Sequence, residues 1–325
     1  MRKWNGLILM LLAAVLVLSA CGKDSGSGSN ASGSTGESST EAGAANDADR
    51  TIETVMGQVK VPAHPKKIVV LTNEGTEALL SMGIKPVGAV KSWTGDPWYP
   101  HIKDQMQGVE NVGDEGQPNV EAIAALEPDL ILGTKMRQEK IYEQLSAIAP
   151  TVFSETLRGE WKDNFKLWAN AVDEKEKGDQ VLADYDKHVA DVKAQIGDKL
   201  STKVSMVRFM PGKARIYYND TFSGIILKEV GLARPAVQDN PGFSDDVGKE
   251  RIPDMNGDIL FYFTYETGDG EGSKMEKEWT EDKLWKNLEV VKKGNAHRVD
   301  DAIWNTAGGV LAANLMLDQL ASYFK

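Results

Sequence analysis

The sequence is poor in the residues that build disulfide frameworks and metal centres. It has one cysteine in 325 residues, and its four histidines (His64, His101, His188 and His297) are scattered. A single cysteine excludes a disulfide framework and any multi-cysteine metal site. Positive charge is also scarce, because the formal net charge is −11. Binding to nucleic acid needs a basic surface, so we expect no nucleic-acid partner.

Motifs of secreted enzymes are absent too. The chain has no Gly-x-Ser-x-Gly elbow, no His-Glu-x-x-His pair and no phosphate-binding glycine loop. The acidic stretch 268–272 lacks the ligand spacing of an EF-hand. With 41% hydrophobic and 26% charged residues, the composition is that of a soluble globular protein. These absences argue against an enzyme, and we expect no resident metal or cofactor.

The first segment reads as a targeting signal. Arg2 and Lys3 precede a 12-residue apolar run, Leu7 to Leu18, which is too short for a permanent membrane helix and typical of a secretory signal. The run ends in Leu-Ser-Ala-Cys, which resembles a bacterial lipobox and implies that Cys21 is lipidated. Residues 22–50 contain no Val, Ile, Leu, Phe, Trp or Tyr, so they are expected to form a flexible tether.

The rest of the chain shows α/β patterning. Short apolar runs at 68–71, 86–90, 130–132 and 150–153 predict strands, and helices are expected at 75–82, after Asn119 and at 138–148. Strands that alternate with helices favour a mostly parallel sheet with helices on both faces. The pattern returns after residue 199, with predicted strands at 204–207, 215–218, 259–263 and near 297–299.

Residues 161–196 lack strands and show two one-sided helical stripes. Trp161, Phe165, Trp168 and Val172 recur at spacings of four, three and four, which predicts a core face. A second stripe runs from Leu182 to Ile196, and Asp173 is expected to cap that helix. The fold class is therefore α/β, with two Rossmann-like lobes joined by one long helix. The predicted segments are a signal peptide (1–20), a lipidated Cys and tether (21–50), an N-terminal lobe (51–172), an interlobe helix (173–198) and a C-terminal lobe (199–325).

This arrangement resembles the substrate-binding lipoproteins of bacterial ABC importers, in the helical-backbone group (class III) that binds ferric siderophores, cobalamin and haem. The segments that carry the resemblance are PKKIVVLTNEGTEALLSMGIKPVG, PNVEAIAALEPDLILGTK, KIYEQLSAIAPTV and VDDAIWNTAGG. It implies a monomeric receptor that carries a ferric siderophore to an ABC permease and its ATPase. It also implies attachment through Cys21 to the extracellular face of the cell membrane, in a Gram-positive bacterium.

Three arginines are candidates for ligand binding. Arg137 follows a predicted strand, and the carboxyl ends of parallel strands face the ligand crevice. Arg208 and Arg215 flank a Pro-Gly turn in the second lobe, where one is expected to face the cleft and the other to brace it. Guanidinium groups suit the oxygen-rich surface of a ferric chelate.

Aromatic residues in loops are the candidates for the cleft walls. Trp93 and Trp98 lie in an irregular Pro-containing stretch, whereas Tyr217, Phe222 and Tyr262 offer a second wall. The resemblance adds Trp304 and Asn305 as ligand contacts. It also assigns one surface glutamate per lobe, Glu121 and Glu250, to docking with the permease.

The loop 301–309 informs the choice of ligand. Relatives that bind polycarboxylate siderophores tend to carry several arginines there, and this loop has none. We therefore expect a ferric hydroxamate or a mixed citrate-hydroxamate. Haem or cobalamin on the same architecture remains an alternative, as does a secreted enzyme, and direct capture of zinc or manganese is disfavoured by the scattered histidines.

Overall fold

The computed structural model describes residues 48–157 and 159–325. The described residues all belong to one compact unit. The predicted signal peptide, Cys21 and the tether up to residue 47 lie outside the described residues. Within the described part, no helix combines the length and the apolar character that crossing a bilayer requires.

The N-terminal lobe is built on a five-stranded parallel sheet in the order β5-β4-β3-β8-β9. Its central strands are buried throughout, which explains why they read as unbroken apolar runs. Two small hairpins accompany the sheet, and the first begins at Arg50, one residue inside the predicted tether. The strands are β1 (Arg50–Thr54), β2 (Gly57–Val61), β3 (Ile68–Val70), β4 (Gly88–Ala89), β5 (Glu110–Asn111), β6 (Gly113–Asp114), β7 (Gln117–Pro118), β8 (Leu130–Thr134) and β9 (Thr151–Ser154).

The helices α1 and α2 of this lobe begin at capping side chains. Thr72 accepts a hydrogen bond from the Gly75 amide at the start of α1, and Asn119 accepts one from the Ala122 amide at the start of α2. The helix expected over 138–148 is broken into three short turns. The helices are α1 (Asn73–Ser81), α2 (Val120–Ala125), α3 (Lys135–Gln138), η1 (Glu139–Ile141), α4 (Tyr142–Ser146) and α5 (Trp161–Ala171).

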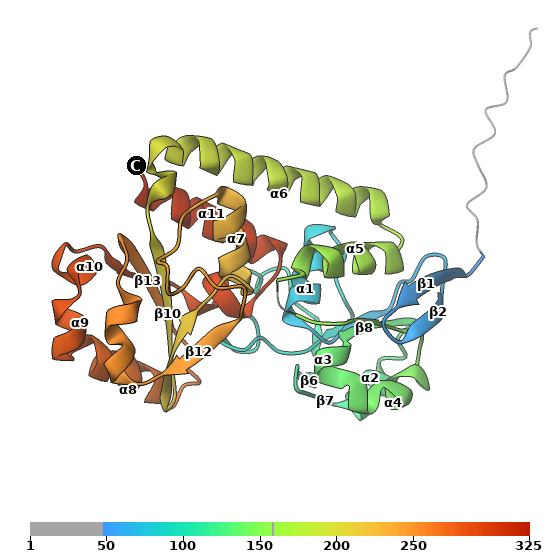
Figure 1. Ribbon diagram of the computed structural model, residues 1–325. Coiled ribbons are helices and arrows are strands. Elements are labelled where there is room, and N and C mark those ends of the chain that lie inside the picture. The colour runs from blue at the N-terminus through green and yellow to red at the C-terminus, as the bar shows by residue number, and fades with distance from the viewer. Residues whose placement is uncertain (1–47, 158) are drawn as a thin grey trace, which may run out of the picture. The chain divides into compact units, whose positions relative to one another are not determined.

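One long helix, α6 (Lys175–Ile196), joins the lobes. It packs against α5 near its N-terminal end and against α7 (Phe222–Val230) and α11 (Val310–Tyr323) further along (Figure 1). Gly178 allows the close approach to α5, because a β-carbon there would lie 2.6 Å from the Ala169 β-carbon. The expected cap is wrong: Asp173 has a positive φ, and its carboxylate contacts His64 and forms an ion pair with Arg50 instead. Trp161, Phe165 and Trp168 lie in the core.

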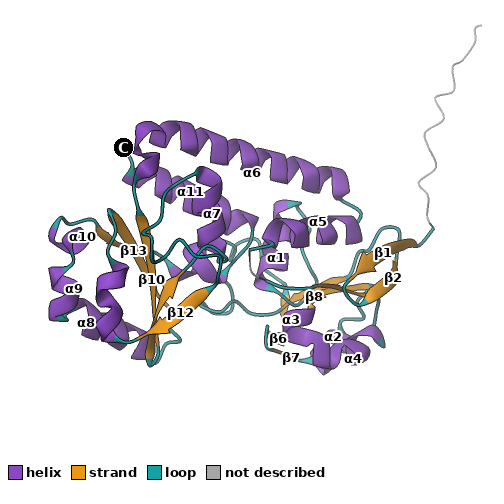
Figure 2. Cartoon of the chain, in the orientation of Figure 1, coloured by secondary structure: helices purple, strands orange, loops and turns teal. Residues whose placement is uncertain are grey.

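The C-terminal lobe has a mixed sheet in the order β12-β11-β10-β13-β14, of which Figure 2 labels β12, β10 and β13. β10, β13 and β14 are parallel, whereas β11 pairs antiparallel with β10 and β12 pairs antiparallel with β11. The strands are β10 (Val204–Met210), β11 (Lys213–Tyr217), β12 (Ser244–Val247), β13 (Ile259–Thr264) and β14 (Ala296–Arg298). The helices are η2 (Gly197–Ser201), α7 (Phe222–Val230), η3 (Lys249–Met255), α8 (Glu271–Thr280), α9 (Lys283–Asn287), α10 (Glu289–Lys292), the π-helical turn η4 (Ala302–Thr306) and α11 (Val310–Tyr323). The predicted α/β class with two lobes and a connecting helix is confirmed.

Candidate functional site

A cavity of about 410 Å³ lies between the lobes and is lined by both. Its N-terminal wall comes from segments that follow parallel strands, since Glu74 follows β3, Trp93 follows β4 and Arg137 follows β8. This is the edge at which open α/β sheets bind ligands. Glu115 lies in the turn of the β6-β7 hairpin, which comes after β5. The complete lining is Glu74, Trp93, Glu115, Met136, Arg137, Leu157, Arg208, Met210, Arg215, Tyr217, Phe222, Phe243, Tyr265, Asn305, Thr306, Ala307 and Gly308.

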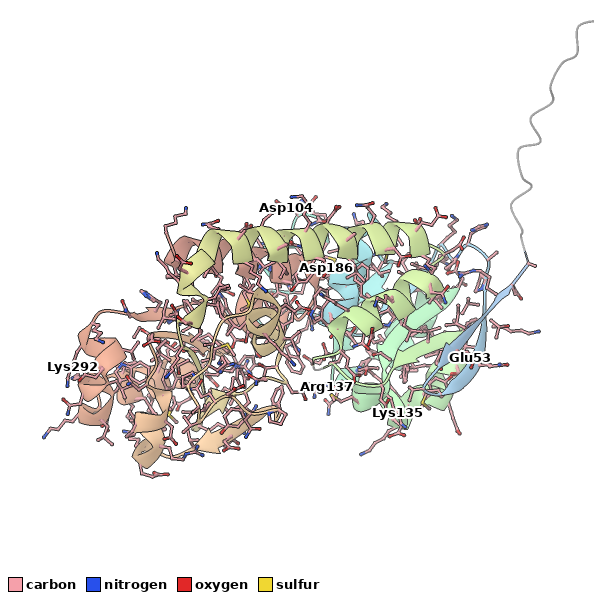
Figure 3. The ribbon with its side chains drawn as sticks, turned by 45° about the horizontal axis from the view of Figure 1, so that its top comes forward. Glu53, Asp104, Lys135, Arg137, Asp186 and Lys292 are labelled. Atoms are coloured by element: carbon pink, nitrogen blue, oxygen red, sulfur yellow. The ribbon has the colours of Figure 1, made fainter. Side chains whose placement is uncertain are left out.

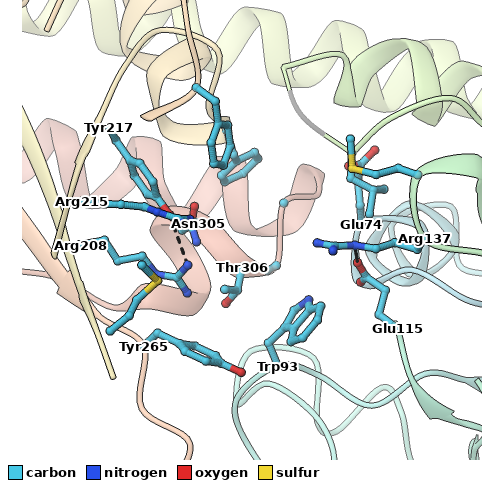
Figure 4. Close-up of a pocket in the computed structure, with 17 residues that line it drawn as sticks. Glu74, Trp93, Glu115, Arg137, Arg208, Arg215, Tyr217, Tyr265, Asn305 and Thr306 are labelled. Carbon is cyan, nitrogen blue, oxygen red and sulfur yellow. Dashed lines mark hydrogen bonds and ion pairs between the residues drawn. The ribbon is translucent and has the colours of Figure 1, made fainter. Parts of the chain in front are cut away.

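The N-terminal wall presents a guanidinium stacked on an indole. The Arg137 guanidinium carbon lies 5.6 Å from the centre of the Trp93 ring, and Nε of Arg137 lies 3.4 Å from a Glu115 carboxylate oxygen (Figure 4). Arg137 remains 43% exposed, so its outer edge is free for a ligand, whereas Glu115 is buried. Figure 3 shows Arg137 on the side of this lobe that faces the C-terminal lobe, with Lys135 further out.

Arg208 is the central cation of the opposite wall. Its Nε and Nη2 donate to the two oxygens of Asp301 at 2.6 and 2.9 Å, and its Nη1 donates to the Tyr217 hydroxyl at 3.3 Å. The guanidinium also lies over the Tyr265 ring. Both Arg208 and Asp301 are more than nine-tenths buried, so their geometry is fixed before any ligand arrives.

Arg215 lines the same wall from the neighbouring strand, and its Nε donates to Asp246. The expectation that only one of Arg208 and Arg215 faces the cleft is wrong, because both line the cavity. The three cavity arginines therefore share one feature: each is paired with its own carboxylate, which removes most of the net positive charge.

Most of the residues predicted to bind ligand meet in this cavity. They are Trp93, Arg137, Arg208, Arg215, Tyr217, Phe222 and Asn305. Glu121 and Glu250, assigned to docking, are exposed in the first turns of α2 and η3, away from the cavity.

Three predicted ligand residues lie elsewhere. Trp98 is buried in the core. Tyr262 contacts Phe209 and Trp285. Side chains alternate along β13, so Tyr262 lies on the opposite face of the sheet from Phe261 and Phe263.

Trp304 is fully buried, and its indole Nε1 donates to Gln319 at 2.7 Å. The π-helical turn η4 sends Trp304 inward and leaves the next two residues, Asn305 and Thr306, in the cavity wall. Neighbouring residues of one irregular turn thus take opposite roles.

Sequence reasoning missed two buried acids of the wall, Glu74 and Glu115. Both are about 95% buried. Their one available signal was position, since each comes shortly after a parallel strand, where side chains point toward the ligand edge.

Comparison with known proteins agrees with this architecture. A family model described as periplasmic binding protein matches residues 68–302, and the chain belongs to that family. The probable siderophore-binding lipoprotein YfiY of Bacillus subtilis is 54% identical over 334 positions, which cover 100% of this chain and 99% of that protein.

Two further comparisons bear on ligand class. The iron(3+)-hydroxamate-binding protein FhuD of Bacillus subtilis is 31% identical and aligns with 90% of this chain and 88% of its own. The crystal structure of Staphylococcus aureus SirA complexed with staphyloferrin B matches with a TM-score of 0.77 and 35% identity, covering 84% of this chain and 98% of that one. The fold is that of the class III binding proteins predicted from the sequence.

Proposed function

We propose that this protein is the receptor of an ABC importer and binds a ferric siderophore between its two lobes. The cavity supports this proposal, because it combines guanidinium donors with aromatic walls, the groups suited to the oxygens and apolar arms of a chelate. Siderophore-binding names among the relatives point the same way. In this proposal the siderophore supplies every ligand of the iron, and the protein contacts only the siderophore.

The charge balance of the cavity favours a weakly charged chelate. Arg137, Arg208 and Arg215 each have a carboxylate partner, so the wall offers hydrogen-bond donors with little excess positive charge. A ferric hydroxamate or citrate-hydroxamate fits this balance better than a tricarboxylate or a tris-catecholate. The absence of arginine from the loop 301–309 supports the same choice.

Delivery to the permease is proposed to use Glu121 and Glu250. Both side chains are exposed, one on each lobe, and neither lines the cavity. Exposed carboxylates can pair with arginines of a membrane partner without disturbing the bound ligand. Lipidation of Cys21, in line with the lipoprotein name of the 54% identical relative, would hold the receptor at the extracellular face of the membrane.

The identity of the cargo is the direct test of this proposal. Protein purified from an iron-starved native host should carry a small molecule that mass spectrometry identifies as a siderophore. Absorption spectra of the same sample separate the alternatives, since a Soret band would indicate haem. Recovery of haem or cobalamin in stoichiometric amount would overturn the proposal.

A further inference from the structure

Glu74 occupies an unusual position for a glutamate, in the wall of the cavity where the two lobes meet. It lies in the first turn of α1 and is only 5% exposed. Its Oε2 lies beside Gly308 of the opposite lobe, because a β-carbon built on that glycine would stand 4.0 Å from it. Both residues line the cavity, and Figure 4 shows Glu74 on the same side as Glu115 and Arg137.

Glu74 is not the only buried carboxylate here, but its neighbours Glu115 and Glu77 each have several hydrogen-bond donors or basic side chains as partners. Glu115 accepts hydrogen bonds from the backbone and side chain of Asn73 and lies beside Arg137. Glu77 contacts His101 and accepts a hydrogen bond from the Ala312 amide in the first turn of α11.

Glu74 has no comparable partner among the described residues. Its Oε1 accepts a hydrogen bond of 2.8 Å from Asn164 Nδ2, which also donates to the Thr156 carbonyl. No ion pair joins Glu74 to a cation in residues 48–157 and 159–325. The charged groups that act on it are the carboxylates of Glu115 and Glu77.

These surroundings disfavour the charged form. Burial raises the pKa of Glu74 well above its usual value, and the two neighbouring carboxylates raise this pKa further, against the opposing effect of Asn164. A neutral carboxyl group keeps the Asn164 hydrogen bond on Oε1 and carries a proton on Oε2, the oxygen beside Gly308. In the neutral form, that O–H group would be a donor at the lobe junction.

We propose that Glu74 determines ligand specificity by meeting the bound chelate as an undissociated carboxylic acid and donating a hydrogen bond to one of its oxygen acceptors. The inference rests on the proposed function, because it concerns the same cavity. An acid donor selects ligands with hydroxamate, amide or carboxylate oxygens at that point. Ionisation of Glu74 would remove the donor and place a negative charge against the ligand oxygens, so affinity falls as the pH rises.

The test uses the full chain and two variants, Glu74→Gln and Glu74→Ala. The probes are ferrioxamine B, a ferric trihydroxamate, and ferric aerobactin, a ferric citrate-dihydroxamate, titrated between about pH 6 and about pH 9. Glutamine keeps a neutral donor, so E74Q is expected to bind like the wild type at the acidic end and to lose the decline in affinity at the alkaline end. E74A is expected to bind about threefold to tenfold more weakly at the acidic end.

Comparison of the wild type with E74Q cancels the pH dependence of the chelate itself. The matched control is Glu143→Gln, an exposed acid of α4, which should retain the wild-type pH profile. The inference is overturned if E74Q keeps that profile, or if E74Q binds as weakly as E74A at the acidic end while its thermal unfolding there matches the wild type.

An infrared spectrum of the ligand-free protein separates this inference from the proposed function. An undissociated carboxyl C=O band should be present at neutral pH in the wild type and missing in E74Q. If the band is present but neither probe binds, the proposed function fails for these chelates. If a probe binds and the band is absent, the role of Glu74 alone is overturned.

Discussion

Arg208 donates hydrogen bonds to both carboxylate oxygens of Asp301, from Nε at 2.6 Å and from Nη2 at 2.9 Å. The pair links β10 to the residue just before η4, the turn that contributes Asn305 and Thr306 to the cavity. A buried bidentate pair fixes geometry and cancels charge together. The cavity is therefore preorganised for directional hydrogen bonding more than for the capture of anions.

Replacing Asp301 with Asn tests how far the Arg208–Asp301 pair determines stability and ligand charge preference. The substitution leaves the Arg208 charge buried without a counterion, so the free energy of unfolding should fall by about 3–5 kcal/mol. Binding should shift toward more negatively charged ferric chelates. Urea unfolding and competition between chelates measure the two effects. Asp246→Asn, which removes the exposed partner of Arg215, should cost no more than about 1 kcal/mol; equal losses in the two variants would contradict the account.

Replacing Arg137 with Ala should weaken siderophore binding by about tenfold to a hundredfold, because the free edge of its guanidinium supplies charge-assisted hydrogen bonds. Lys135→Ala is the matched control, since Lys135 lies on the same short helix, pairs with Glu139 and does not line the cavity. Calorimetric titration checks both. Similar losses of siderophore affinity in the two variants would contradict a direct role of Arg137 in binding.

The stability of the protein should depend on pH through Glu74. Its folded pKa is raised, so the folded state holds a proton that the unfolded chain releases at lower pH. The stability associated with this proton is complete below the unfolded pKa and is lost as the pH rises through the folded pKa. E74Q should therefore unfold at a higher temperature than the wild type at alkaline pH, with the difference shrinking toward acidic pH. A constant difference across pH would refute the assignment.

Glu121 and Glu250 should affect transport without affecting binding. Replacing both with Ala should leave siderophore affinity intact and abolish uptake of radioactive iron by cells. The control is the double substitution of Glu53 and Glu143, two exposed acids of the N-terminal lobe. Normal uptake by the variant that lacks Glu121 and Glu250 would exclude them as docking residues.

The sequence predicted the lobes and the connecting helix because their signals are local. Buried strands read as apolar runs, and the stripe from Leu182 to Ile196 has helical periodicity. The hairpin β1-β2, strand β12 and helix α8 were missed. β12 carries two adjacent exposed aspartates, Asp245 and Asp246, and its place is set by pairing with β11, which a single sequence does not reveal.

The site was predictable where strand ends alone place the side chain, as for Arg137. The site was not predictable where adjacent residues lie in different environments, one in the core and the next in the cavity wall. Trp304 and Asn305 are adjacent, and only the wide turn η4 separates their roles. Glu74 was missed because a glutamate in a first helical turn ordinarily faces solvent and favours the helix dipole, whereas α1 is buried on nearly every side.

The central claim is that the cavity binds a ferric siderophore of low negative charge. Titration of intrinsic tryptophan fluorescence with a panel of ferric chelates tests it most directly, because Trp93 lines the cavity. The panel should contain a hydroxamate, a citrate-hydroxamate, a tricarboxylate and a tris-catecholate. The account predicts tightest binding, at one molecule per chain, for the hydroxamate or the citrate-hydroxamate. Tightest binding of the tricarboxylate or the tris-catecholate, or no binding of any chelate, would contradict it.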